Sequence, residues 1–272
     1  SKDLSLRADI YSRFDDPTNV KYETETIGVG LSLGFPLSNS NRIRTKYSLL
    51  SSNTKADSDA TDYENLLSGT STVSVVGYSL SIDKRNSPYK PSGGSIFTIE
   101  QNLAGVGGNS NYLENKISYK IYKKLNKTFT GAIKSEFGAI NGYSGKYAPV
   151  DSMFNIGGKK LRGFKYGKVG PQLSTSFTGG NYYYLIATET NFDLPIDEYD
   201  ISSSLFFDVG SVWGLDDRYG SIDDSHNLRA SIGLNLVWDS AIGPINFVLA
   251  EPFMSETTDT TDKFSFDIGY NF

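Results

Sequence analysis

The 272-residue sequence contains no cysteine and only one histidine, His226. The lack of cysteine excludes disulfide bonds, thiolate nucleophiles and cysteine-ligated metal sites. No run of 18 apolar residues occurs, which excludes a transmembrane helix. A formal net charge of −5 and the lack of a basic helix argue against a surface that binds nucleic acid. Aromatic residues are abundant instead, with 18 tyrosines and 16 phenylalanines.

Alternation between apolar and polar residues is the dominant pattern. In the segment LRASIGLNLVWD, residues 228–239, apolar side chains occupy almost every second position. The same period of two recurs in residues 26–35 and 264–272. A period of two is typical of β-strands that have one apolar and one polar face.

The segments with this pattern are long. Most have nine to fifteen residues, whereas five or six is usual in soluble sheets, and a strand tilted across a bilayer needs about 9–11. The sequence therefore predicts an all-β fold, a transmembrane antiparallel β-barrel with about twelve strands. The predicted strands cover residues 4–14, 22–36, 41–51, 72–84, 94–104, 111–124, 129–140, 181–193, 201–213, 228–239, 244–253 and 262–272.

Short and long links between the predicted strands alternate along the chain. LSNS at 37–40 is short, and the link at 141–180 is the longest. Bacterial outer-membrane barrels combine short periplasmic turns with long outer loops. AGVGGNSN at 104–111 is predicted to be a short outer turn, and KRNSPYKPSGG at 84–94 a longer inner one. These two exceptions do not remove the alternation.

Charged side chains fall on one face of the predicted strands. An Arg or Lys that faces lipid at mid-depth costs about 2–4 kcal/mol, so this face is expected to line a polar lumen. Its members include Arg42, Arg44 and Lys46 in one strand and Glu114, Lys116, Ser118 and Lys120 in another.

A basic, glycine-rich segment, GGKKLRGFKYGKVGP at 157–171, interrupts the strand pattern. Its LRGF core resembles the V-R-G-F/Y loop signature of the BamA family, the outer-membrane protein assembly factors, with Leu in place of the usual Val. The four motif residues are Leu161, Arg162, Gly163 and Phe164.

Further segments resemble the same family in the same order along the chain. They are the turn at 83–95, with Asp83, Arg85, Pro91 and Gly93 in register, the strand FFDVGSVW at 206–213, and the last two strands, WDSAIGPINF at 238–247 and FSFDIGYNF at 264–272. The resemblance thus covers the whole chain. The family barrel has sixteen strands preceded by periplasmic POTRA domains. The twelve strands resemble the fifth to sixteenth, so residues 1–272 are expected to be one barrel domain, truncated at its N-terminus, with the POTRA domains absent.

The resemblance gives Arg162 a role. Arginine keeps its charge at any ordinary pH and prefers planar acceptors that take two hydrogen bonds. Glu189 and Asp208, both predicted to face inward, match family positions that contact the motif arginine. The loop 141–180 is therefore expected to fold into the lumen and to be held at the wall by Arg162. A solvated basic surface loop is the alternative interpretation.

The last strand is the second candidate site. Its outward-facing residues end on an aromatic side chain, which resembles the targeting signal of outer-membrane barrels; a lipid-facing strand with an interfacial aromatic anchor explains the same pattern. In the family this strand forms one side of a weak seam, and Gly269 matches a glycine at which the strand can bend inward. The residues are Phe264, Phe266, Ile268, Gly269, Tyr270 and Phe272.

The resemblance implies an insertase that folds and inserts β-barrel proteins into the bacterial outer membrane through a seam at the C-terminal strand. The expected partners are the outer-membrane bilayer, nascent outer-membrane β-barrel proteins and accessory assembly lipoproteins, with no nucleic acid, cofactor or metal. A two-partner secretion transporter or a TamA-like translocation factor of the same superfamily is the alternative, and a passive diffusion porin is the alternative from another class. An enzyme is not expected, because no base stands beside a nucleophile and His226 lies in a predicted outer loop.

Overall fold

Twelve antiparallel strands form one sheet in the computed structural model, which describes residues 4–15, 21–173, 176–194, 201–215, 222–240 and 243–268. Each strand of the sheet pairs with the next strand of the sheet along the chain. β7 pairs with β10, and a long loop that contains β8 and β9 connects these two strands. The strands of the sheet are β1 (Ser5–Asp15), β2 (Tyr22–Pro36), β3 (Asn41–Ala56), β4 (Gly69–Asp83), β5 (Gly93–Gly108), β6 (Tyr112–Lys124), β7 (Thr130–Gly142), β10 (Tyr182–Asp193), β11 (Ile201–Trp213), β12 (Arg229–Ser240), β13 (Gly243–Met254) and β14 (Phe264–Ile268). Smaller elements lie in the loops: α1 (Asp62–Leu67), the 3-10 turn η1 (Val150–Ser152) and the hairpin of β8 (Gln172–Leu173) and β9 (Ser176–Phe177).

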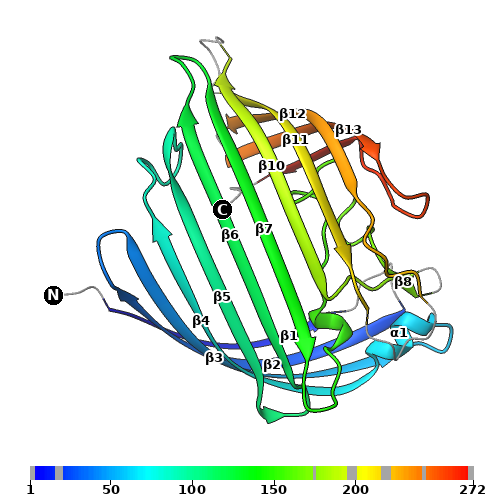
Figure 1. The fold of residues 1–272 in the computed structure, drawn as a ribbon. Helices are drawn as coiled ribbons and strands as arrows, with labels where there is room; N and C mark the ends of the chain where they lie inside the picture. Colours follow the sequence, from blue (N-terminus) through cyan, green and yellow to red (C-terminus); the bar gives the residue numbers. More distant parts are fainter. Residues whose placement is uncertain are drawn as a thin grey trace.

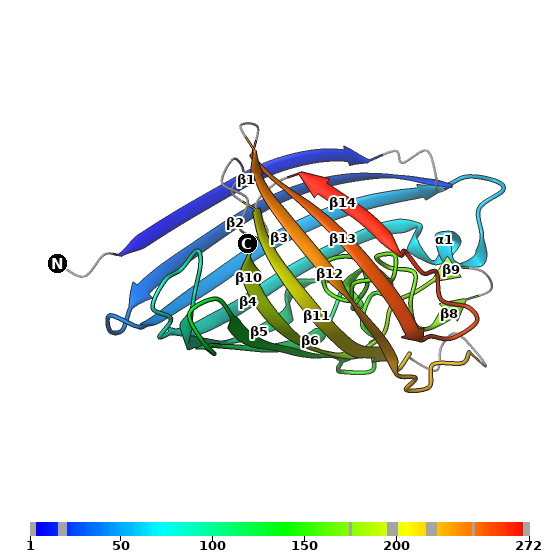
Figure 2. The ribbon, with the colours of Figure 1, turned by 90° about the horizontal axis from the view of Figure 1, so that it is seen from above.

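The sheet curls around a central space (Figure 1). No hydrogen-bonded ladder joins β1 to β14 within the described residues, so this part of the chain forms a barrel wall with two edges. The chain between β7 and β10 lies in the space that the wall encloses (Figure 2). The predicted all-β fold, an antiparallel barrel wall with about twelve strands, is confirmed.

The two faces of the wall differ as the alternation predicts. On β11, Leu205 and Phe207 are 56% and 40% exposed, whereas Phe206 and Asp208, which alternate with them, are almost fully buried. A continuous apolar surface of this kind would be costly in water, whereas a lipid-facing barrel band requires it. The exposed apolar face continues over the other strands, for example at Ile10, Leu31, Ile117, Ile133, Ile232 and Leu249. The outer face therefore suits hydrocarbon.

Helices contribute little to the fold. The six-residue α1 begins with a capping box, in which the Thr61 side chain accepts from the backbone of Glu64 and the Glu64 carboxylate accepts from the backbone of Thr61. None of the helices within the described residues is long and apolar enough to cross a membrane.

The structure corrects the extent of two predicted links, and it describes only part of the last predicted strand. The predicted short link at 104–111 is present but shorter, at 109–111, because β5 continues to Gly108 and its extra residues form a β-bulge opposite Ser74. The predicted link 52–71 is shorter, since β3 extends to Ala56, and it contains α1, which the alternation did not indicate. In the last predicted strand, 262–272, residues 269–272 lie outside the described part of the chain.

Candidate functional site

The loop between β7 and β10, residues 143–181, is here called the plug loop. Its neck is closed where Phe154 and Gly180 exchange backbone hydrogen bonds of 2.9 and 3.0 Å. Beyond the neck, apolar side chains of the loop pack against inward-facing side chains of the wall and form the main buried cluster. Its largest members from the loop are Phe154, Ile156, Leu161, Phe164 and Val169, and from the wall Tyr112, Ile140, Tyr183, Leu185 and Val212. The hydrophobic core thus lies inside the barrel, between the plug loop and the wall.

The LRGF motif sits in a tight hairpin of the plug loop. The Gly158 N–H donates to the carbonyl of Phe164 at 2.7 Å, and the Gly167 N–H to that of Ile156 at 2.9 Å. Gly163 has a φ of +90°, in the left-handed region that favours glycine. A Cβ there would lie only 3.1–3.2 Å from side-chain atoms of β12 and β13, those of Ser231, Ala250 and Pro252. Glycine therefore lets the motif backbone lie against the wall.

Arg162 is held from several directions. Its Nε and Nη2 donate to the two carboxylate oxygens of Asp208 at 2.7 and 2.6 Å, the bidentate geometry that guanidinium favours. Nη2 also lies 2.9 Å from Glu189 Oε1. The guanidinium carbon stands 3.7 Å from the centre of the Phe206 ring, a cation–π contact. The backbone is held too, because the Arg162 carbonyl accepts from Ser231 Oγ at 2.5 Å.

The charges in this cluster balance. Glu189 accepts a second cation, with Lys134 Nζ 2.6 Å from its Oε2. Two cations therefore face two carboxylates, and the side chains of Arg162, Asp208 and Glu189 are each at most 10% exposed. Removing one member of such a buried group leaves an uncompensated charge and typically costs about 3–5 kcal/mol.

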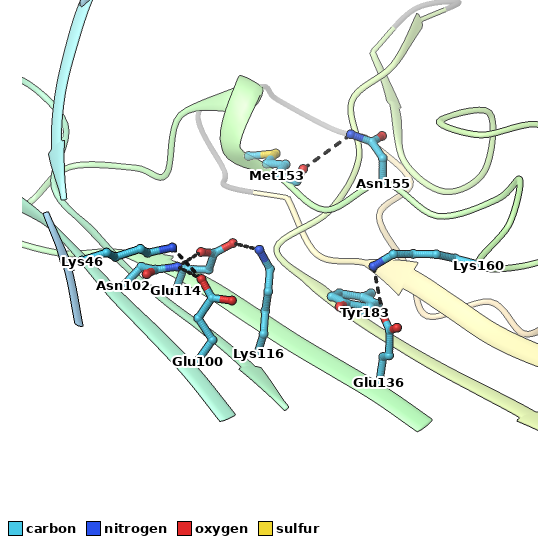
Figure 3. A network of polar contacts seen from close by, with 10 residues as sticks. All are labelled: Lys46, Glu100, Asn102, Glu114, Lys116, Glu136, Met153, Asn155, Lys160 and Tyr183. Carbon is cyan, nitrogen blue, oxygen red and sulfur yellow. Dashed lines mark hydrogen bonds and ion pairs between the residues drawn. The ribbon is translucent and has the colours of Figure 1, made fainter. Parts of the chain in front are cut away.

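Two lysines at the tip of the hairpin reach different parts of the wall. Lys160 Nζ lies 2.9 Å from Glu136 on β7 and 5.4 Å from the centre of the Tyr183 ring (Figure 3). Lys159 Nζ lies 2.7 Å from Asp267 on β14. The neighbouring wall carries its own chain of paired charges from β3 to β6, formed by Lys46, Glu100, Asn102, Glu114 and Lys116 (Figure 3). The inward face is therefore polar, as the strand pattern predicts, and these particular charges lie in pairs.

A second buried ion pair was not singled out from the sequence. Arg229, at the start of β12, donates from Nε and Nη2 to Asp259 at 2.9 and 3.1 Å. Both side chains are almost completely buried, at 3% and 0% exposure. Arg229 stood on the polar face of its predicted strand, but Asp259 lies in a loop of Thr and Asp residues where no local pattern marks a partner. Only the folded chain brings the two together.

The predicted site residues fall into three groups. Arg162 is brought together with both predicted carboxylates, Glu189 and Asp208. Phe264, Phe266 and Ile268 lie on the exposed outer face of β14. Gly269, Tyr270 and Phe272 lie outside the described residues. No cluster of three or more residues able to hold a metal occurs within the part of the chain that the structure describes.

Comparison with known proteins places this architecture in a family. The BamA outer-membrane protein assembly factor of Neorickettsia risticii is 26% identical over 264 residues, which cover 95% of this chain and 35% of that protein. The crystal structure of BamA from Haemophilus ducreyi lacking POTRA domains 1–3 superposes with a TM-score of 0.83 at 23% identity, covering 97% of this chain and 58% of that chain. CdiB from Acinetobacter baumannii is less similar, with a TM-score of 0.58 at 13% identity, over 97% of this chain and 46% of that one.

This chain therefore spans about a third of the length of the curated relative and just over half of the solved BamA chain. The resemblance to the BamA family that the motifs indicate is confirmed by these matches. The profile of the Omp85 superfamily domain matches residues 1–272, from the first residue to the last. The chain belongs to the Omp85 superfamily.

Proposed function

We propose that this chain is the barrel part of an assembly factor that folds and inserts β-barrel proteins into the bacterial outer membrane. The proposal is supported by membership of the Omp85 superfamily and by the similarity to BamA along almost the whole chain. The observation that carries it is the plug loop, bound inside the wall through Arg162, Asp208 and Glu189. A lumen filled in this way favours work at the edge of the sheet over passage through the barrel.

The proposed mechanism uses the backbone of the edge strand. A barrel strand in hydrocarbon must have its N–H and C=O groups paired, because each unpaired group costs several kcal/mol there. An entering strand of a nascent barrel satisfies its own groups and those of the edge by adding to β14, as in strand-addition complexes. Strand pairing and burial of the apolar outer face in lipid supply the driving force, so the reaction proceeds without nucleotide or cofactor.

The partners follow from this mechanism. The apolar outer face of the wall binds the lipid of the outer membrane, and the edge at β14 binds the C-terminal strands of nascent barrels. Accessory assembly lipoproteins are the remaining proposed partners. The outward residues Phe264, Phe266 and Ile268 serve both as lipid contacts and as the part of this chain that an assembly machinery reads when this barrel is itself inserted.

Two alternatives differ in what crosses the lumen. A passive diffusion porin needs an open lumen, whereas here the plug loop packs a hydrophobic cluster against the wall. A secretion transporter of the same superfamily would have to displace that loop to pass a polypeptide. The sequence similarity to the BamA assembly factor along 95% of this chain favours the assembly factor.

Depletion of the gene in its native organism tests the proposal. If the chain is an assembly factor, the folded forms of many outer-membrane barrel proteins fall together, and the wild-type gene restores them. A gene with Arg162→Ala restores them poorly, whereas Lys165→Ala, which removes an exposed cation from the same loop, restores them fully. Unchanged barrel levels after depletion would refute the proposal, and the loss of one secreted polypeptide alone would favour the transporter.

A further inference from the structure

The loop between β13 and β14, residues 255–263, is here called the strap, because it crosses the plug loop before the chain enters the last strand. Its anchor is the buried pair of Asp259 and Arg229. The Asp259 carboxylate also accepts from the backbone N–H of Glu256 at 2.8 Å, and Arg229 Nη1 donates to the carbonyl of Asn227 at 2.7 Å. The pair therefore fixes the strap to the wall and sets the turn of the strap itself.

The strap is hydrogen-bonded to the plug loop along the stretch that begins at the motif. The Lys165 N–H donates to the Thr260 carbonyl at 2.9 Å, and the Thr260 N–H donates to the Lys168 carbonyl at 3.0 Å. The Asp262 N–H donates to the carbonyl of the motif residue Gly163 at 2.8 Å. Three backbone bonds make the strap and the plug hairpin one short ladder, which is stiffer than a contact between side chains.

The strap then leads directly into β14. The Ala250 N–H donates to the Lys263 carbonyl at 2.9 Å, and β14 begins at the next residue, Phe264. Further along β14, Asp267 forms an ion pair with Lys159 at the tip of the plug hairpin, with Lys159 Nζ 2.7 Å from its carboxylate. The plug loop thus holds β14 at two levels, through the strap and through Lys159.

The two levels differ in strength. The pair of Arg229 and Asp259 is buried, so breaking it leaves a buried charge with no opposite charge beside it. Lys159 is 60% exposed and Asp267 30%, so water can replace either partner and the contact is weak. The strap is therefore a firm anchor, and the contact between Lys159 and Asp267 is the part that opens first.

We propose that the strap and Lys159 together form a tether that sets the position of β14 from inside the barrel, with Arg229, Asp259, Lys159 and Asp267 as positioning residues for that strand. Release of Lys159 from Asp267 frees the inner face of β14 while the strap keeps its beginning in place. The last strand can then move without loss of the plug loop. That this movement serves strand addition rests on the proposed function; the tether itself does not.

Hydrogen–deuterium exchange on the membrane-reconstituted protein, read by mass spectrometry, tests the tether. The reporter is the exchange rate of amides in β14 (264–268), and the reference is β11 (201–213). Lys159→Ala is expected to raise exchange in β14 about two- to five-fold, the range for an exposed ion pair, and to leave β11 unchanged. Asp259→Asn is expected to raise it by at least about tenfold, because its partner is buried.

The controls separate positioning from general stability. Lys146→Ala removes an exposed plug-loop cation outside the strap ladder and is expected to change neither strand. Lys159→Glu combined with Asp267→Lys is expected to restore β14 toward the parent rate. Unchanged exchange in β14 for Lys159→Ala, or an equal rise in β11 and β14, would overturn the proposal. If Asp259→Asn does not fold, the Lys159 single and swapped variants decide. Exchange does not depend on assembly activity, so a failed tether and a failed assembly function give different results.

Discussion

The Arg162 side chain contacts three different wall residues at once. Its guanidinium meets Asp208 with two nitrogens, Glu189 with one and the Phe206 ring with its face. Lysine would keep the charge but would lose the planar fork and the stacking. The site therefore depends on the shape of the cation as well as on its charge.

Arg162→Lys is expected to lower the free energy of unfolding of the barrel by about 1.5–3 kcal/mol, because it removes hydrogen bonds to a charged group and such bonds usually contribute this much. Urea unfolding of the reconstituted protein, followed by the heat-dependent shift of the folded band in gel electrophoresis, measures this change. Lys165→Ala serves as the control for charge. A lysine variant as stable as the parent would show that the bidentate contact adds nothing.

Gly163→Ala separates crowding from backbone strain. The new Cβ meets the side chains of β12 and β13 at 3.1–3.2 Å in addition to an unfavourable positive φ. Gly145 has a φ of +70° with nothing within 4 Å, so Gly145→Ala carries the strain alone. We expect about 1–2 kcal/mol of destabilisation for Gly145→Ala and more for Gly163→Ala. Equal losses in unfolding experiments would mean that the wall does not crowd the motif.

At the scale of elements, the sequence predicts where the strands lie and which face of the sheet each side chain is on. It does not predict the local structure of the links between them. A period of two fixes which residues share a face, so Arg42, Lys46 and Lys116 could be assigned to the lumen in advance. The bulge at the end of β5 was missed because GVGG in isolation has the composition of a turn, and only pairing with β4 keeps it in the sheet. The short helix α1 depends on a capping box and on tertiary contacts, which carry no periodic signal.

The assignment of faces can be tested at two adjacent residues of β6. Ile117 faces outward and is 39% exposed, whereas Ser118 faces inward near Glu100 and Glu136. Ile117→Lys is expected to cost about 2–4 kcal/mol in a lipid bilayer, because its charge would face hydrocarbon. Ser118→Lys is expected to cost less than about 1 kcal/mol. Equal effects on folding yield and urea stability in lipid vesicles would contradict the assignment.

The attachment of α1 is expected to weaken in acid. The backbone N–H groups of Thr61 and Lys21 donate to the Glu64 carboxylate and hold its pKa below the ordinary 4.5. Since the folded-state pKa is lowered, this stabilisation is complete above pH 4.5 and is lost as the pH falls through the lowered value. Once exchange rates are corrected for the intrinsic rate, which itself falls in acid, the protection of α1 amides should decrease on acidification in the parent but not in Glu64→Gln. An identical acid response in both would assign the effect to another group.

At the scale of the whole molecule, wall, plug loop and strap form one connected unit. The motif resemblance and the inward parity of Glu189 and Asp208 were enough to indicate the partners of Arg162 before the structure. The pair of Arg229 and Asp259 was not predictable, because 30 residues and two strands separate a wall residue from its loop partner. Nor does the sequence distinguish Lys159 from Lys160, although these neighbours contact β14 and β7. The alternation of apolar and polar residues predicts which face of the sheet a side chain lies on, whereas contacts between loops are seen only in the folded structure.

The central claim, that this protein inserts other barrels, is tested most directly by the rate at which a urea-unfolded outer-membrane barrel becomes folded in lipid vesicles. The protein is used in its natural full length, with the accessory proteins that co-purify with it, against empty vesicles and vesicles that carry Arg162→Ala. We predict faster folding with the parent protein, a rate near that of empty vesicles with Arg162→Ala, and the parent rate with Lys165→Ala. A substrate that folds equally fast in empty and parent vesicles would contradict the claim.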